Sequence, residues 1–347
     1  MGQLRTATWR LRAAIREHSD APLRTRHCGL TRYTRSPAVL ATPESAWWHG
    51  SIRCRARVCP VCWLGRRQRA ARTICWCLSE WERDTKRNSR MATLTLAHGA
   101  EDSVSLTRGV RAAWRRMQQT AAWRRYRRGT GLETVVAEEV TFGANGWHPH
   151  LHIAALQREH GDVLDEASRW FEAWADAVRR ELGDRHEPSL EHGVDLMDCA
   201  PGTYLAKLGL ELADPGAAKS GALGWADAHE PDEFALEREA RRGRVRGMSP
   251  LELVYRAELD RYFELMTHRK RARDITYSRG LRAIRDREPE PALETSELAV
   301  SAADYELVRH REGDLGLLHV LDIASTNGLE AAQEEIARVC LKISSAG

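Results

Sequence analysis

Gly146-Trp147-His148-Pro149-His150-Leu151-His152-Ile153-Ala154 is the most informative stretch of this sequence. Successive side chains of a β-strand point to opposite faces, so the alternation predicts a strand with three histidines on one face and apolar residues on the other. Two imidazoles two residues apart on a rigid strand suit a divalent metal ion. The histidine face is therefore a candidate metal site, and a histidine-rich surface strand is the alternative.

A second predicted strand, 133–142, precedes the histidines, and Gly143-Ala144-Asn145-Gly146 between the two is typical of a hairpin turn. The two strands are expected to be antiparallel neighbours, with Glu139 close to His150. A carboxylate with two imidazoles leaves coordination positions open for water and a phosphate oxygen. This donor set favours Mg²⁺ or Mn²⁺ over a closed structural zinc site.

Further elements are predicted on both sides of this hairpin. The Pro/Glu-rich residues 287–297 are expected to be a linker. We predict three regions, 1–85, 86–286 and 287–347. The predicted strands are 91–97, 192–196 and 317–322, and the predicted helices are 63–84, 105–126, 163–182, 250–273, 328–343 and one that starts near Pro201.

The charged residues are unevenly distributed. Residues 1–130 contain 27 Lys+Arg and 8 Asp+Glu, a net charge of +19, whereas residues 131–347 carry −15. A basic region of this size favours nucleic acid as a partner, because phosphate contacts release counterions; a solvated arginine surface is the alternative. No apolar run approaches the roughly 18 residues of a membrane span, and the N-terminus has no apolar signal core. We therefore expect a cytoplasmic protein with no membrane partner.

Six of the eight cysteines lie within the first 77 residues. In a reducing cytosol such a cluster favours a metal site over disulfides. Cys54-x4-Cys59-Pro60-Val61-Cys62 supplies three thiols, and Cys28 is the expected fourth ligand, with His27 as the alternative. Four such ligands fit a tetrahedral structural Zn²⁺. The arginines around this zinc module favour contact with DNA, notably Arg55, Arg57, Arg66 and Arg67, and a purely structural role of the module is the alternative.

Tyr204 and Lys207 form a Tyr-x-x-Lys pair. On the helix predicted to start near Pro201, positions i and i+3 are neighbours. A nearby ammonium group favours the phenolate of a tyrosine, whose ordinary pKa is about 10. Tyr204 is therefore a candidate nucleophile toward a phosphate, and core packing is the alternative.

Three motifs occur in a particular order: TLTLAH (93–98), GWHPHLH (146–152) and YLAK (204–207). This order resembles the HUH endonucleases, and among them the rolling-circle plasmid replication initiators of the one-tyrosine type. EVTFG (139–143) and YSRGLR (277–282) also resemble parts of this family. The resemblance covers about residues 50–285.

The resemblance implies an α+β fold, in which an HUH nuclease domain with a central antiparallel sheet flanked by helices follows an N-terminal zinc-binding module. It implies that His150 and His152 bind the metal, with Glu139 as the candidate third ligand. The implied activity is that of a metal-dependent DNA endonuclease and strand transferase, in a bacterial cytoplasm. Its partners are plasmid origin DNA, single-stranded or hairpin, and the host helicase and polymerase.

The resemblance also assigns the covalent step. Tyr204 is expected to attack the scissile phosphate, which gives a 5′-phosphotyrosyl enzyme and a free 3′-OH primer. Lys207 is expected to orient or neutralise the phosphate, and His148 to contact DNA or support the metal ligands. Some members carry a glutamate four residues before the tyrosine that activates water for termination. This chain has Ala200 there, and the acidic alternatives are Asp198 and Glu211.

Two other functions stay open. A relaxase or single-strand transposase uses the same chemistry, and a non-enzymatic zinc-containing DNA-binding regulator needs the histidines only for structure. Tyr204 separates the enzymes from the regulator, because only a nicking enzyme requires its hydroxyl.

Overall fold

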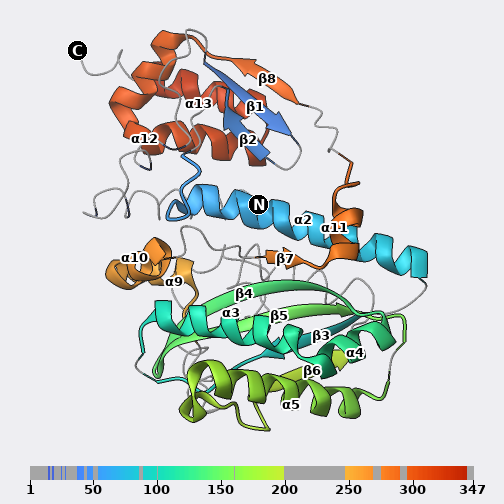
Figure 1. Ribbon diagram of the computed structural model, residues 1–347. Coiled ribbons are helices and arrows are strands. Elements are labelled where there is room, and N and C mark those ends of the chain that lie inside the picture. Colours follow the sequence, from blue (N-terminus) through green and yellow to red (C-terminus); the bar gives the residue numbers. More distant parts are fainter. Residues whose placement is uncertain are drawn as a thin grey trace, which may run out of the picture.

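The protein is α+β, as the resemblance implies, with two antiparallel sheets flanked by helices (Figure 1). Tyr204 and Lys207 lie outside the described residues, as does the helix predicted to start near Pro201. The computed structural model describes residues 37–42, 45–49, 54–85, 89–99, 101–159, 161–198, 247–268, 275–289 and 295–341, together with Ile15, His18, Thr25 and Cys28.

The larger sheet has five strands in the order β6-β3-β5-β4-β7, so the histidine strand β5 is central. The β4–β5 hairpin closes with Gly143 opposite Gly146, and this register places Glu139 opposite His150. The strands are β3 (Ser89–Leu94), β4 (Glu133–Gly143), β5 (Gly146–Leu156), β6 (Val194–Asp198) and β7 (Ile275–Tyr277).

Helices α3 (Ser103–Gln119) and α5 (Val163–Leu182) cover the apolar face of this sheet. Leu151 and Ile153 of β5 are buried in the same core as Trp170 and Trp174 of α5. The prediction of a single helix over 105–126 is wrong, because the helix is interrupted at Thr120, between α3 and α4 (Ala121–Thr130). The Thr120 hydroxyl accepts from the Trp123 N–H and so starts α4 as its N-cap.

Helix α2 (Pro60–Thr85) lies against the opposite face of the sheet (Figure 1). Leu78 and Trp81 of α2 pack with Ala154 and Leu156 of β5, and α11 (Arg279–Arg285) contributes to the same core. Along β5, the side chains on this face change from histidine to apolar at Ala154. The packing of α2 therefore uses one end of this face, and the histidines occupy the other.

The second sheet joins the two ends of the chain. It has the order β2-β1-β8, and Trp48 of β2 donates its indole N–H to the Leu317 carbonyl at 3.1 Å. The boundaries predicted at residues 85 and 287 stay predictions, but the N-terminal hairpin packs within the C-terminal unit. The elements of this unit are β1 (Ala38–Thr42), β2 (Ser45–Trp48), β8 (Ser296–Ala299), α12 (Ala302–Thr326) and α13 (Leu329–Leu341).

Three further expectations are wrong in the C-terminal half. Residues 317–322 lie within α12 and are not a strand. The prediction fails because a short apolar run fits the side-chain period of a strand and that of a buried helix equally well. Part of the predicted linker forms β8. The helix predicted over 250–273 is α9 (Pro250–Tyr255) followed by α10 (Leu259–His268), and Ala257 between them has a positive φ of 62°. No helix among the described residues is long and apolar enough to cross a membrane.

Candidate functional site

Glu139, His150 and His152 meet at one carboxylate oxygen, and we call them the Glu-His-His cluster. Oε2 of Glu139 lies 2.6 Å from Nε2 of His150 and 2.9 Å from Nε2 of His152. The three donor groups lie within 4.8 Å of one another. Their side chains are between 8% and 12% exposed. The three side chains therefore form a compact, largely buried set of ligands that is able to hold one metal ion.

The hydrogen bonds on the far side of each ring orient the cluster toward a cation. Nδ1 of His150 lies 3.3 Å from the His148 carbonyl oxygen, which accepts and cannot donate. In the neutral tautomer that carries its proton on Nδ1, the His150 ring would donate to this carbonyl and present the lone pair of Nε2 to the Glu139 side. Two acceptors this close require a proton or a metal cation beside them. Metal-binding histidines commonly donate the other ring N–H to a backbone carbonyl in this way.

Thr93 orients the second histidine, a role that was not predicted from the sequence. Its hydroxyl lies 3.3 Å from Nδ1 of His152, which it faces directly in the β3–β5 ladder. A hydroxyl both donates and accepts, so it supports His152 in either tautomer. The signal in the sequence is the T-L-T alternation of the first motif, which puts Thr93 on the histidine face of the sheet.

His148 and His98 continue the row of imidazoles beyond the metal ligands. The ring centroids of His98 and His148 are 4.5 Å apart, and those of His148 and His150 are 5.3 Å apart. Burial lowers the pKa of His98, which favours its neutral ring. His98 ends the TLTLAH motif, so this motif contributes a second side chain to the site. The DNA contact predicted for His148 stays a prediction.

The acidic neighbours of the cluster have other partners. Glu138 points to the opposite face of the sheet from Glu139 and pairs with Arg111. Asp198, an alternative to the glutamate that Ala200 replaces, lies 2.7 Å from the Arg90 guanidinium, which also binds Glu166 at 2.7 Å. The Asp198 carboxylate is thus part of an ion-pair network at the edge strand. Ala200 and Glu211 lie outside the described residues.

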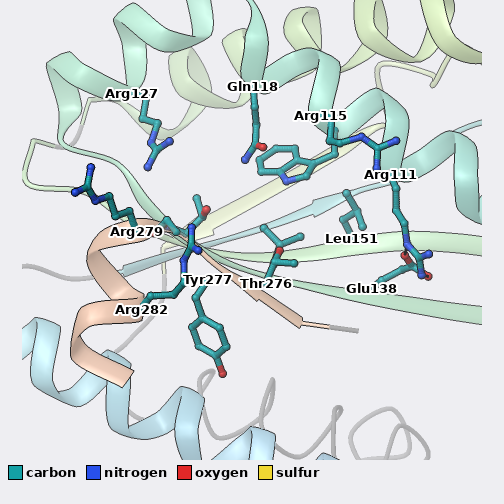
Figure 2. A pocket seen from close by; sticks show the side chains of 14 residues that line it. Arg111, Arg115, Gln118, Arg127, Glu138, Leu151, Thr276, Tyr277, Arg279 and Arg282 are labelled. Atoms are coloured by element: carbon teal, nitrogen blue, oxygen red, sulfur yellow. Dashed lines mark hydrogen bonds and ion pairs between the residues drawn. The ribbon is translucent and has the colours of Figure 1, made fainter. Parts of the chain in front are cut away.

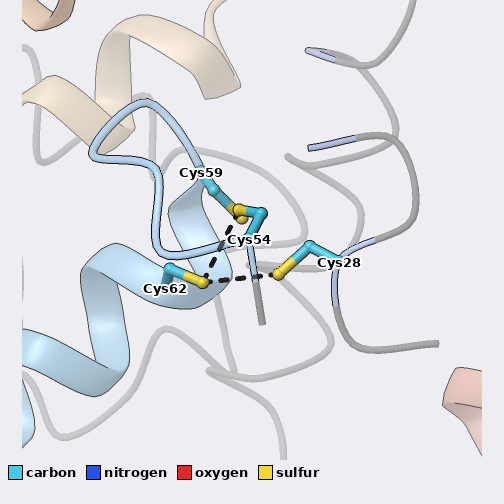
Figure 3. A group of neighbouring side chains, drawn as sticks. All are labelled: Cys28, Cys54, Cys59 and Cys62. Atoms are coloured by element: carbon cyan, nitrogen blue, oxygen red, sulfur yellow. Dashed lines mark hydrogen bonds between the residues drawn. The ribbon is translucent and has the colours of Figure 1, made fainter. Parts of the chain in front are cut away.

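Four cysteines form a second candidate metal site, shown in Figure 3. The Cys62 sulfur lies 3.4 Å from that of Cys28 and 3.7 Å from that of Cys54. Four sulfurs about 2.3 Å from a tetrahedral zinc ion are separated by about 3.8 Å, so the arrangement fits Zn²⁺. Cys28, predicted from the sequence as the fourth ligand, is in this group. The alternative ligand, His27, lies outside the described residues.

The loop and the helix start together explain why these thiols converge. Pro60 begins α2 directly after Cys59, which places Cys62 in the first turn of the helix, near the positive end of its dipole. The Tyr262 hydroxyl donates to the Val58 carbonyl at 2.7 Å and anchors the loop to α10. Hydrogen bonds from Cys28 and Cys59 lower the pKa of the Cys54 thiol to about 7, which favours the thiolate that binds zinc.

The arginines assigned to DNA contact differ in their surroundings. Arg66 donates to the Arg55 carbonyl at 3.2 Å and to the Ala56 carbonyl, so it also holds the cysteine loop. Arg55 is exposed and has a positive φ of 53°, and Arg57 is half-buried. The side chain of Arg67 lies outside the described part. DNA contact by these residues stays a prediction.

Replacing Cys59 with serine is expected to remove the zinc and unfold the cysteine loop. Structural zinc contributes on the order of 10 kcal/mol, comparable with the whole stability of a domain. Elemental analysis should find about one zinc ion per chain in the wild type and none in the variant. Cys77→Ser is the matched control, because Cys59 and Cys77 are both fully buried and only Cys59 is in the cluster. Wild-type protein without zinc would contradict the assignment.

Comparisons with known proteins give one match. The chain is 28% identical over 196 residues to a protein named "Protein rep" from Streptomyces lividans, an alignment that covers 42% of this chain and 42% of the relative. The match thus spans less than half of the relative's length. No protein family matches the chain, and no solved structure matches it.

Proposed function

We propose that this protein is an HUH-type initiator of rolling-circle plasmid replication, which nicks one strand of origin DNA and stays attached to the 5′ end through Tyr204. The Glu-His-His cluster on β4 and the central strand β5 carries this proposal. The order of the three sequence motifs and the similarity to a protein named Rep support it. The set of a carboxylate and two imidazoles leaves open coordination positions, which suits work on a phosphate ester.

The covalent step is a transesterification. The phenolate oxygen of Tyr204 attacks the scissile phosphorus, a new P–O bond to the tyrosine forms, and the bond from phosphorus to the 3′ oxygen breaks. The leaving oxygen takes a proton and becomes a 3′-OH, the primer for a host polymerase, while the phenol proton goes to solvent. Lys207 neutralises charge on the phosphate. Glu139, His150 and His152 would hold a Mg²⁺ or Mn²⁺ ion, which would supply polarisation of the phosphate.

A cavity on the same face of the sheet as the cluster supports the approach of a DNA strand. This cavity, of about 310 Å³, lies between α2 and β7. Tyr277 pairs with Val135 in the sheet, and strand alternation puts both on the same face as Glu139. Basic and aromatic side chains together are typical of single-strand binding. The lining includes Trp63, Arg66, Arg69, Tyr277 and Arg285.

Incubation with supercoiled plasmid carrying its own origin tests the proposal. We expect open circles that appear only with Mg²⁺ or Mn²⁺, and mass spectrometry of the digested product should place the DNA on a peptide that contains Tyr204. A chelated sample is the control. Origin binding without nicking would favour the zinc-containing regulator and contradict the proposal. Transfer of the nicked strand to a second DNA molecule without replication in cells would favour the relaxase or transposase.

A further inference from the structure

A second basic site lies on the face of the large sheet opposite to the Glu-His-His cluster. Val136 and Glu138 of β4 line it, and strand alternation turns them toward α3, whereas Glu139 faces the other side. The cavity has a volume of about 550 Å³ and lies between α3, α4 and α11 (Figure 2). We call it the arginine groove, after Arg111, Arg115, Arg127, Arg279 and Arg282.

The positive charge of the groove is only partly neutralised. Arg111 pairs with Glu138, and Arg127 donates to the Leu132 carbonyl at 3.1 Å and lies 3.7 Å from Glu133. Within the described ranges, no carboxylate forms an ion pair with the other three arginines, which are exposed. Guanidinium groups that share one cavity repel one another, and a bound anion relieves this repulsion. The unpaired arginines are Arg115, Arg279 and Arg282.

The shape of the site indicates an extended anion. The arginines come from two walls far apart in the sequence, and Figure 2 shows Arg127 and Arg279 at one end with Arg111 at the other. A guanidinium group matches a phosphate with two parallel hydrogen bonds. Trp114 and Leu151 add an apolar part to the lining, against which a base is able to pack. A cavity of this volume has room for about one or two nucleotides.

We propose that the arginine groove binds the phosphodiester backbone of single-stranded DNA and holds it on the side of the sheet away from the reacting phosphate. This inference rests on the proposed function, since it assumes that DNA is the substrate. The groove would retain a strand already separated from the origin while the Glu-His-His face holds the scissile phosphate. Binding on one face is therefore separable from cleavage on the other.

Fluorescence anisotropy with a labelled oligothymidylate tests the groove. The variant combines Arg115→Ala, Arg279→Ala and Arg282→Ala. The matched control combines Arg108→Ala, Arg169→Ala and Arg256→Ala, three exposed arginines outside the groove, and changes the net charge equally. The loss of three phosphate contacts should make the negative slope of log K, the binding constant, against log salt shallower by about 2. It should also weaken binding about tenfold at moderate salt. The control should keep the wild-type slope.

The outcomes separate this inference from the proposed function. Equal salt slopes for the two triple variants would overturn the groove as a DNA site, whether or not the wild type nicks DNA. Tighter binding of a duplex of the same length would overturn the assignment to single strands, as would displacement of the oligonucleotide by a nucleoside triphosphate at equal phosphate concentration. A wild type that binds the oligonucleotide through the groove but never nicks origin DNA would instead contradict the proposed function.

Discussion

Replacing Tyr204 with phenylalanine is expected to abolish the covalent protein–DNA adduct and to leave origin binding intact. Phenylalanine keeps the ring and removes the one oxygen that would form the bond to phosphorus. No other side chain is expected to attack the phosphate at a comparable rate. Denaturing gels with labelled origin DNA measure the adduct, and anisotropy measures binding on the same samples. The expected result is binding without any shifted protein band.

Tyr126→Phe is the control for this experiment. Tyr126 accepts hydrogen bonds from Trp170 and Gln157, and burial raises the pKa of its phenol to about 12, so it is held as the neutral phenol. This control variant loses a hydroxyl too, at a position that packs α4 against α5, and should form adduct at the wild-type rate. Adduct formation by Tyr204→Phe would refute the assignment of Tyr204 as the nucleophile and would indicate another tyrosine.

Strand alternation and a short turn predict much of the candidate site from sequence. The histidines share one face because the side-chain period of a strand is two, and the Asn-Gly turn fixes the register that brings Glu139 beside His150. These relations are local, since all the residues lie within one hairpin. The four-cysteine cluster was predictable for a different reason, because metal-binding thiols have a characteristic spacing in the chain.

The parts of the site that come from distant segments were not predictable in this way. Thr93 reaches His152 only because β3 pairs with the other edge of β5, and the T-L-T alternation does not indicate this long-range pairing. The arginine groove likewise needs α11 to dock beside α3, and the N-terminal hairpin needs β8 as its neighbour. Residues 317–322 show the limit within one segment, since their apolar run suited a strand and tertiary packing made it part of α12.

Replacing Glu139 with glutamine is expected to lower both metal affinity and nicking by at least about 100-fold, because even residues that only support metal ligands cost 10–100-fold when replaced. Oε2 of Glu139 is the atom that both imidazoles share, and glutamine keeps its shape while removing the charge that a hard divalent cation prefers. Raising the Mn²⁺ concentration should restore part of the nicking rate. Such rescue distinguishes a lost ligand from a damaged fold.

Thermal unfolding gives a readout of the same change that does not depend on activity. A metal ion at 100 times its Kd stabilises the folded protein by about 2.7 kcal/mol, so Mn²⁺ should raise the Tm of the wild type and leave that of Glu139→Gln unchanged. Glu166→Gln is the matched control, since Glu166 is equally buried and paired with Arg90 away from the cluster. It should lose stability and keep the Mn²⁺-dependent rise. If Mn²⁺ raised the Tm of Glu139→Gln as much as that of the wild type, this carboxylate would not hold the metal.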